Sequence, residues 1–411
     1  MGKDKQLKRS LGLWDILMFG VGGIVGAGIY AIIGEAAALG GNMLWLSFVI
    51  ASLVALLTAL SYAEFVSRFP DSGGSFEYIK QSLGKKPAFI MSGFMVLTGV
   101  VAAAAIAISF ASYLNRLWEI PAWIIVIGIV ALMAFFNIIG AKYSSYYNSF
   151  ATIVTLSGLA VVIAVAIPEI GTVDLTKLNN AGWNGILAGG ALIFFSYIGF
   201  EDLVKMAEET KNPEKNMPKG VLLSGIAVLV IYVLIAISSV SVLDWNKLAQ
   251  SEGPLAAVIE TKLGTIGATG LVVVALFATS KTILSNILGT SRLLYDIARD
   301  SEVKWLKKFT TISGIGNAPN YAIIAITVLA IGFGLLGNLK LVASISNIFI
   351  FIVFGMVNFS LLIFRYKNRD KEKAPFHIPL NIKNIPIPTI LALITILILF
   401  GYNIYNLTQG S

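Results

Sequence analysis

The sequence predicts an all-α protein that crosses a membrane about eleven times. We expect two inverted repeats of five helices, broken helices 1 and 6, and one extra C-terminal helix. Three observations carry this prediction: a composition of 57% hydrophobic and 13% charged residues, a series of long apolar runs, and two such runs interrupted at corresponding places. Soluble domains have about 25% charged residues.

A membrane-spanning helix requires about 20 apolar residues. Eleven runs of this kind cover residues 13–38, 43–68, 88–114, 121–140, 148–168, 185–210, 219–243, 265–298, 319–337, 341–365 and 386–406. They divide the chain into an N-terminal tail (1–12), a core of helices 1–10 (13–365), a basic loop (366–385), and helix 11 with its tail (386–411).

The loops predict the orientation. If the N-terminus is cytoplasmic, the inner segments hold 24 of the 30 Lys and Arg residues, as the positive-inside rule requires. This topology accounts for the net charge of +8, so we expect a lipid bilayer and no nucleic acid as partner. The predicted location is the plasma membrane, with many crossings.

Residue types that most enzymes need are scarce. The chain has no Cys and a single His, His377, which falls in a charged loop. We therefore expect no cofactor, no metal site and no intramembrane enzyme. A primary pump is disfavoured because no G-x-x-x-x-G-K-[ST] loop is present. A channel is a further alternative. The paired interrupted helices favour a transporter with alternating access over a channel.

Five of the nine residues from Gly20 to Gly28 are glycine, although glycine costs about 1 kcal/mol relative to alanine inside a helix. The glycines do not match the dinucleotide-binding pattern G-x-G-x-x-G, because positions 25 and 31, where its third glycine would fall, hold Val and Ala. A helix-packing face at Gly22 and Gly26 is one explanation. The other is a helix interrupted at mid-membrane, whose free backbone groups face a ligand.

Helix 6 favours the second explanation. Its central Gly199 is followed by Glu201, Asp202 and Lys205, and a lipid-facing helix does not hold such charges at that depth. Helices 1 and 6 are five apart, so the two halves would insert with opposite orientations. Paired interruptions of this kind indicate a secondary transporter with inverted repeats.

Four stretches carry a family resemblance: GGIVGAGIY, YAEFVSRFPDSGGSFEYI, FFSYIGFED with AEETKNPEKNMPKG, and GTSRLLYDIARD. Together they resemble the amino acid permeases of the amino acid–polyamine–organocation (APC) family. The resemblance implies the fold of the leucine transporter, with an amino acid bound between the interrupted helices 1 and 6. Relatives often have twelve helices, whereas eleven are predicted here.

The ends of interrupted helices suit an α-amino acid. Helix N-termini offer free N–H groups to a carboxylate. We expect Gly26, Ala27 and Gly28 to bind the carboxylate, and the carbonyls of Ile24, Phe195 and Ile198 to accept from the ammonium. The resemblance implies the same roles. Gly199 would form the interruption of helix 6, and Phe200 would wall or gate the pocket.

Lys281 lies inside helix 8 beside Thr282. A snorkelling lysine is one explanation. In the other, its ammonium bonds helix 1 carbonyls around Gly22 to Val25. Many relatives place a helix 5 lysine there; counting from Asn148, this position of the chain holds Thr155. A lysine can also release its proton, which suits a proton-coupled cycle.

The inner end carries further charges. Glu201, Asp202 and Lys205 share one face of helix 6 and are predicted to form inner-gate salt bridges. Glu64 is expected to pair with Arg68 at i,i+4.

The predicted function is secondary active transport of neutral or broad-range amino acids, proton-coupled or by exchange and not sodium-dependent. The alternative is a polyamine, amine or cationic amino acid transporter. Polyamines and amines lack the carboxylate, so for them the N–H groups near Gly28 would lose their role.

Overall fold

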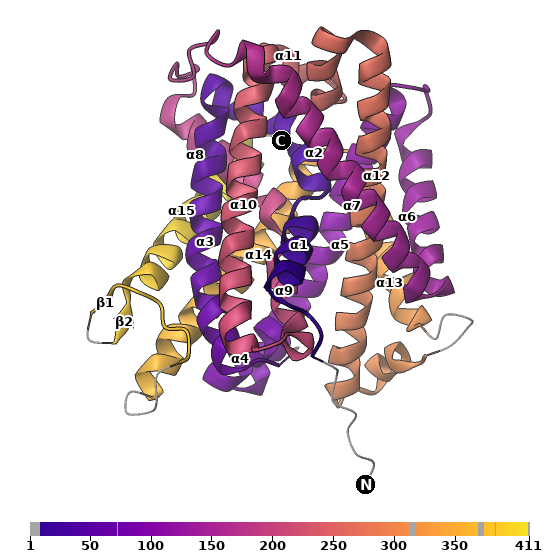
Figure 1. The fold of residues 1–411 in the computed structure, drawn as a ribbon. Coiled ribbons are helices and arrows are strands. Elements are labelled where there is room, and N and C mark those ends of the chain that lie inside the picture. Colours follow the sequence, from indigo (N-terminus) through magenta and orange to yellow (C-terminus); the bar gives the residue numbers. More distant parts are fainter. Residues whose placement is uncertain (1–8, 72, 313–317, 369–373, 383, 410–411) are drawn as a thin grey trace.

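The computed structural model describes residues 9–71, 73–312, 318–368, 374–382 and 384–409. Figure 1 shows a bundle of long helices with α11 at one end and α4 at the other, on the side from which the N-terminus extends. The first half comprises α1 (Leu13–Ile24), α2 (Ala27–Gly40), η1 (Gly41–Met43), α3 (Leu44–Arg68), α4 (Gly74–Leu83), α5 (Lys85–Asn115), α6 (Ala122–Ile139), α7 (Ala141–Ala166) and η2 (Ile167–Glu169).

The second half begins with the interrupted helix 6, which is divided into α8 (Gly182–Ile193), η3 (Phe194–Tyr197), α9 (Phe200–Leu203) and η4 (Val204–Glu209). It continues with α10 (Pro213–Val242), α11 (Trp245–Gln250), α12 (Pro254–Asp300), η5 (Lys304–Thr310), α13 (Asn320–Gly334), α14 (Leu339–Lys367), β1 (Asn381–Ile382), β2 (Ile385–Pro386) and α15 (Ile387–Gln409).

The all-α membrane fold is confirmed. Within the described residues, nine helices are long and apolar enough to cross a membrane, and α1 and α13 are shorter apolar helices. Each of the eleven predicted runs is helical. α12 contains a kink at Gly264, whose φ of +64° is left-handed, and this is where the predicted helix 8 begins. Several shorter elements lie outside the predicted runs, among them α4, α11, η5 and the short antiparallel pair β1–β2.

α5 contributes a run of small side chains to the interior of the bundle. α5 packs against α12, α13 and α14, and its run from Ala102 to Ala105 is buried. Many large apolar side chains point outward, among them Ile153, Val328 and Leu397. An apolar outer surface of this kind fits contact with lipid tails, because such a surface would aggregate in water.

A buried ion pair joins α3 to α14 near the end that carries α4. Arg365 Nε lies 2.8 Å from Glu64 Oε1, and a second guanidinium nitrogen of Arg365 contacts Glu64 Oε2. The Ile378 N–H also donates to Glu64, at 3.0 Å. The predicted Glu64–Arg68 pair is therefore wrong. The Arg68 guanidinium instead lies over the Phe364 ring, because Arg365 offers Glu64 a two-pronged contact inside the protein.

Candidate functional site

Helix 1 is interrupted at Val25 and Gly26, between α1 and α2. Val25 has φ −75° and ψ 83°, and Gly26 has φ −124° and ψ −142°, neither of which is helical. Side chains would not fit along this stretch. A Cβ atom on Gly26 would lie 2.7 Å from Thr282 Oγ1, and one on Gly28 would lie 2.7 Å from the Ser196 Cα atom. The glycines therefore allow helix 1 to approach helices 6 and 8 closely.

Helix 6 is interrupted beside the same point. α8 gives way to the 3₁₀ turn η3, Ile198 is extended, and Gly199 has φ +120°, a conformation that favours glycine. The Gly199 N–H donates to Glu201 Oε2 at 2.8 Å, so this carboxylate caps the first turn of α9. The sequence therefore placed both interruptions at the observed residues.

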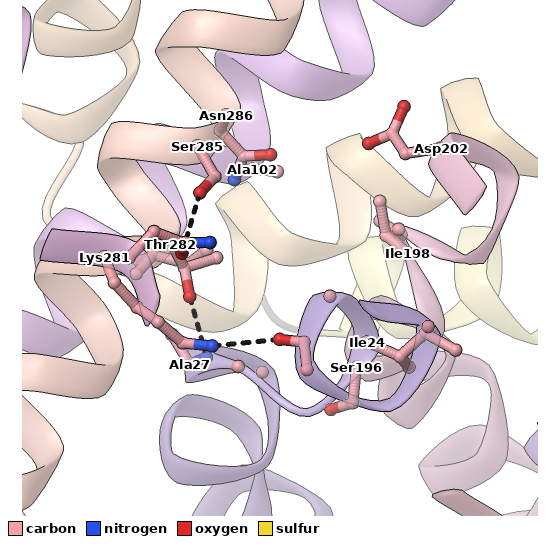
Figure 2. A pocket seen from close by; sticks show the side chains of 18 of the residues that line it. Ile24, Ala27, Ala102, Ser196, Ile198, Asp202, Lys281, Thr282, Ser285 and Asn286 are labelled. Carbon is pink, nitrogen blue, oxygen red and sulfur yellow. Dashed lines mark hydrogen bonds between the residues drawn. The ribbon is translucent and has the colours of Figure 1, made fainter. Parts of the chain in front are cut away.

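A cavity of about 150 Å³ lies between the two interruptions. Figure 2 shows Lys281, Thr282 and Ala27 on one side of it, with Ile198 and Asp202 on the other. Its walls come from α1, α2, α5, η3, α9 and α12. They include the predicted residues Gly22, Ile24, Gly26, Ala27, Gly28, Phe195, Ile198, Gly199, Asp202, Lys281 and Thr282.

The N-terminus of α2 faces this cavity. The first N–H groups of a helix have no partner within it, and they form the positive end of the helix dipole. The Ala27 N–H donates to Thr282 Oγ1 at 3.1 Å, which fixes α12 against this terminus. The Thr282 hydroxyl thus occupies the N–H of Ala27. The N–H of Gly28, the next residue, is the predicted carboxylate ligand that this hydroxyl does not occupy.

Tyr232 on α10 is a site residue that the sequence analysis missed. Its hydroxyl lies 3.0 Å from the Ile24 carbonyl oxygen and 3.1 Å from that of Ser196, so it bridges the two interruptions. The Ile24 carbonyl also accepts from the Gly26 N–H at 2.8 Å. A carbonyl oxygen has two lone pairs. In this conformation the Ile24 carbonyl already has these partners, so the predicted contact with a substrate ammonium would require one of the bonds to open.

The ammonium of Lys281 is buried, and the side chain is 2% exposed. Its Nζ atom lies 3.0 Å from the Gly22 carbonyl, 3.4 Å from the Val25 carbonyl and 3.0 Å from Thr152 Oγ1. An ammonium has three N–H donors, and this set supplies three acceptors. The two carbonyls belong to the C-terminal end of α1, where the helix dipole is negative and favours a cation.

The helix 5 partner of Lys281 is Thr152 and not Thr155. Thr155 lies one turn further along α7, where its hydroxyl donates to the Ala151 carbonyl at 2.7 Å and its own carbonyl accepts from the Tyr30 hydroxyl. The residue of α7 that contacts Lys281 thus lies three residues before Thr155, nearly one helical turn away.

Phe200 does not line the cavity. Its ring packs against Tyr62 and Phe354, at centroid distances of 5.4 and 4.9 Å. Phe200 thus does not form the wall of this cavity, and its predicted role as a gate stays a prediction. The positive φ of Gly199 turns the chain just before Phe200, and this directs the ring toward α3 and α14. Phe195 and Ile198 are among the residues of this helix that do line the cavity.

The predicted inner-gate charges are partly brought together. Lys205 Nζ lies 2.5 Å from Asp202 Oδ1, within one turn of helix 6. Glu201 is not their partner, since it bonds the Gly199 N–H and is only 6% exposed. Asp202 lines the cavity, and all three residues line a smaller neighbouring cavity.

Comparison with known proteins identifies the family. The profile of the amino acid permease family matches residues 11–411. This chain belongs to the amino acid permease family. The resemblance to the APC family is thereby confirmed, and the protein is a transporter and not an enzyme.

Individual relatives are distant. The branched-chain amino acid permease BcaP of Bacillus subtilis is 27% identical over 90% of this chain and 84% of its own length. A methylthioribose transporter from the same organism is 26% identical over 92% and 85%. The cationic amino acid transporter 1 of Arabidopsis thaliana is 29% identical over 90% of this chain and 66% of its own length.

Proposed function

We propose that this permease carries amino acids by alternating access, that a fixed ammonium replaces sodium at its ion site, and that transport is proton-coupled or an exchange. The main support for this proposal is the contact of Lys281 with the end of α1. Carbonyls freed at an interrupted helix are the groups that bind a coupling cation in transporters of this architecture. Here a covalently attached cation already bonds them.

A sodium ion at the same place would be repelled. Two unit charges about 4 Å apart repel each other by about 4 kcal/mol at an effective dielectric constant of about 20. The Gly22 and Val25 carbonyls and the Thr152 hydroxyl are also already engaged. Both arguments favour transport that does not require sodium.

The substrate carboxylate would lie at the N-terminus of α2, on the Gly28 N–H. The positive end of the helix dipole and the close approach allowed by glycine support this assignment. The substrate ammonium would meet the carbonyls of helix 6 at Phe195 and Ile198, which line the cavity opposite α2. Ile24 would join them only if the Tyr232 hydroxyl moved away.

A cationic substrate is the second candidate. The Asp202 carboxylate lines the cavity, and a positively charged side chain could compete with Lys205 for it. The names of the relatives leave both candidates open, because BcaP is a branched-chain permease and several plant relatives are cationic amino acid transporters.

The orientation completes the proposal. We place the protein in the plasma membrane, and the distribution of Lys and Arg between the loops supports a cytoplasmic N-terminus. The cavity wall then continues along Phe19 and Gly20 toward the cytoplasm. On the opposite side of the cavity, α2 packs tightly against the start of α12. A Cβ atom on Gly34 would lie 2.7 Å from the Cγ atom of Pro254.

Competition for uptake separates the candidates. The purified protein is first screened by thermal shift against the twenty amino acids and several amines. The best ligand is then used as radiolabelled substrate in proteoliposomes, with matched competitors that lack either the carboxylate or the side-chain charge. An amino acid permease requires the carboxylate. Uptake inhibited equally well by amines without a carboxylate would overturn the assignment of Gly28.

A further inference from the structure

The short helix η5, between α12 and α13, combines lysines with an exposed tryptophan. Its sequence is KWLKKFT, and Lys304, Lys307 and Lys308 are all exposed. Trp305 is 64% exposed, and its ring meets Phe309 edge-on at 6.2 Å. None of these residues belongs to the transport cavity.

The 3₁₀ geometry sorts these side chains onto faces. Such a helix has three residues per turn, so residues i and i+3 lie above each other. Leu306 and Phe309 share the half-buried face, and η5 contacts α12 and α13. Lys304 and Lys307 share a second face, and Trp305 and Lys308 share the third. The two outward faces therefore present a tryptophan among three cations.

The charges near η5 leave this surface basic. Arg299 pairs with Asp296 at 3.2 Å and approaches Asp300 at 3.7 Å, so these two acids of α12 already have a cationic neighbour. Lys307 donates to the Arg299 carbonyl at 2.8 Å, which holds η5 against the end of α12. Glu302 is the exposed acid next to the segment.

We propose that η5 binds the anionic headgroups of the membrane surface at the end of α12. Tryptophan concentrates at membrane–water interfaces, where its ring meets both lipid tails and headgroups. Lysines beside it attract anionic lipids, which the cytoplasmic leaflet contains. The exposed apolar side chains of Val303 and Ile312 flank η5 and extend the same contact. The lysines would attract either an anionic phospholipid or an acidic protein, and the exposed Trp305 with its apolar neighbours favours the phospholipid.

The absence of native cysteine allows a direct test. A nitroxide is attached at Val303→Cys, which keeps Trp305 and the lysines, and Glu214→Cys serves as the exposed reference at the start of α10. The protein is reconstituted in vesicles of phosphatidylcholine alone or with phosphatidylglycerol. The relaxation of the nitroxide by oxygen, which prefers lipid, is compared with its relaxation by a water-soluble nickel chelate.

We expect position 303 to favour oxygen several-fold more than position 214 in vesicles with phosphatidylglycerol. The triple variant Lys304→Gln, Lys307→Gln and Lys308→Gln should lose most of this difference. The control triple Lys211→Gln, Lys215→Gln and Lys219→Gln removes three other exposed lysines and should keep it. Two results would overturn the proposal. One is equal exposure of positions 303 and 214 to the nickel chelate, as a protein-binding face would show. The other is a preference of position 303 for oxygen that changes neither when phosphatidylglycerol is left out nor when the three lysines are replaced.

Discussion

The Nζ atom of Lys281 on α12 lies 3.0 Å from the carbonyl oxygen of Gly22 on α1. This bond crosses from the eighth predicted membrane helix to the first, at the point where helix 1 ends its first segment. The last carbonyls of a helix have no donor within that helix, and the Lys281 ammonium supplies one at the end of α1. A movement that separates α1 from α12 at this point would break this bond, and we therefore propose that the contact couples the ammonium to the conformation of the transporter.

Removal of the ammonium should stop transport. Lys281→Met keeps the length of the side chain and leaves the Gly22 and Val25 carbonyls without their donor. Hydrogen bonds to a charged group contribute about 1.5–3 kcal/mol each. We expect uptake to fall at least tenfold, with the protein still inserted, and to lose its dependence on a pH gradient. Unchanged uptake with an unchanged pH profile would show that Lys281 serves no coupling role.

A charge swap tests whether the position of the ammonium matters. Thr152 Oγ1 lies 3.0 Å from Lys281 Nζ, so a lysine at 152 reaches the same carbonyls from α7. Lys281→Thr alone should lose transport, and the double variant with Thr152→Lys should regain part of it. The matched control pairs Lys281→Thr with Thr155→Lys, one turn away, and should stay inactive. Equal activity of the two double variants would refute the geometry of the site.

Gly28→Ala tests the close approach of helices 1 and 6. The added Cβ would lie 2.7 Å from the Ser196 Cα atom, a backbone atom that does not move independently. We expect loss of substrate-induced thermal stabilisation and of uptake. Gly128→Ala on α6 is the control, because a Cβ there meets nothing within 4 Å. Substrate binding retained by the Gly28 variant would remove this residue from the site.

Tyr232→Phe tests the bridge between the two interruptions. The variant loses one hydroxyl that contacts the Ile24 and Ser196 carbonyls. A neutral hydrogen bond contributes about 1 kcal/mol, so the fold should survive while the maximal uptake rate falls several-fold. Tyr402→Phe removes a hydroxyl that bonds Asn184 outside the cavity and should leave the rate unaltered. Identical rates for both variants would make the bridge irrelevant to transport.

The Glu64–Arg365 pair predicts an asymmetry in stability. Side-chain exposures are 2% and 6%, so Glu64→Gln leaves a buried cation uncompensated and should cost about 3–5 kcal/mol. Glu260→Gln breaks the more exposed pair with Arg116 and should cost about 0–1 kcal/mol. Thermal unfolding in detergent compares the two variants. A smaller loss for Glu64→Gln than for Glu260→Gln contradicts the assignment of a buried pair.

The sequence predicted what depends on local pattern. Apolar runs identified the helices, and glycines followed by charges located both interruptions, because each signal lies within one segment. The errors concern contacts between segments. The Arg365 partner of Glu64, the bridge by Tyr232 and the position of Thr152 opposite Lys281 depend on how the helices rotate against each other. Hydropathy does not report that rotation, since all faces of a buried helix are apolar.

If the Lys281 ammonium replaces a sodium ion, uptake should not require sodium. The dependence of the uptake rate on the cation of the medium tests this directly. Wild-type protein in proteoliposomes is supplied with its substrate in sodium chloride or choline chloride, at the same ionic strength and pH. We expect equal initial rates in the two salts, because the ammonium of Lys281 already bonds the carbonyls of Gly22 and Val25. A strict requirement for sodium would contradict it.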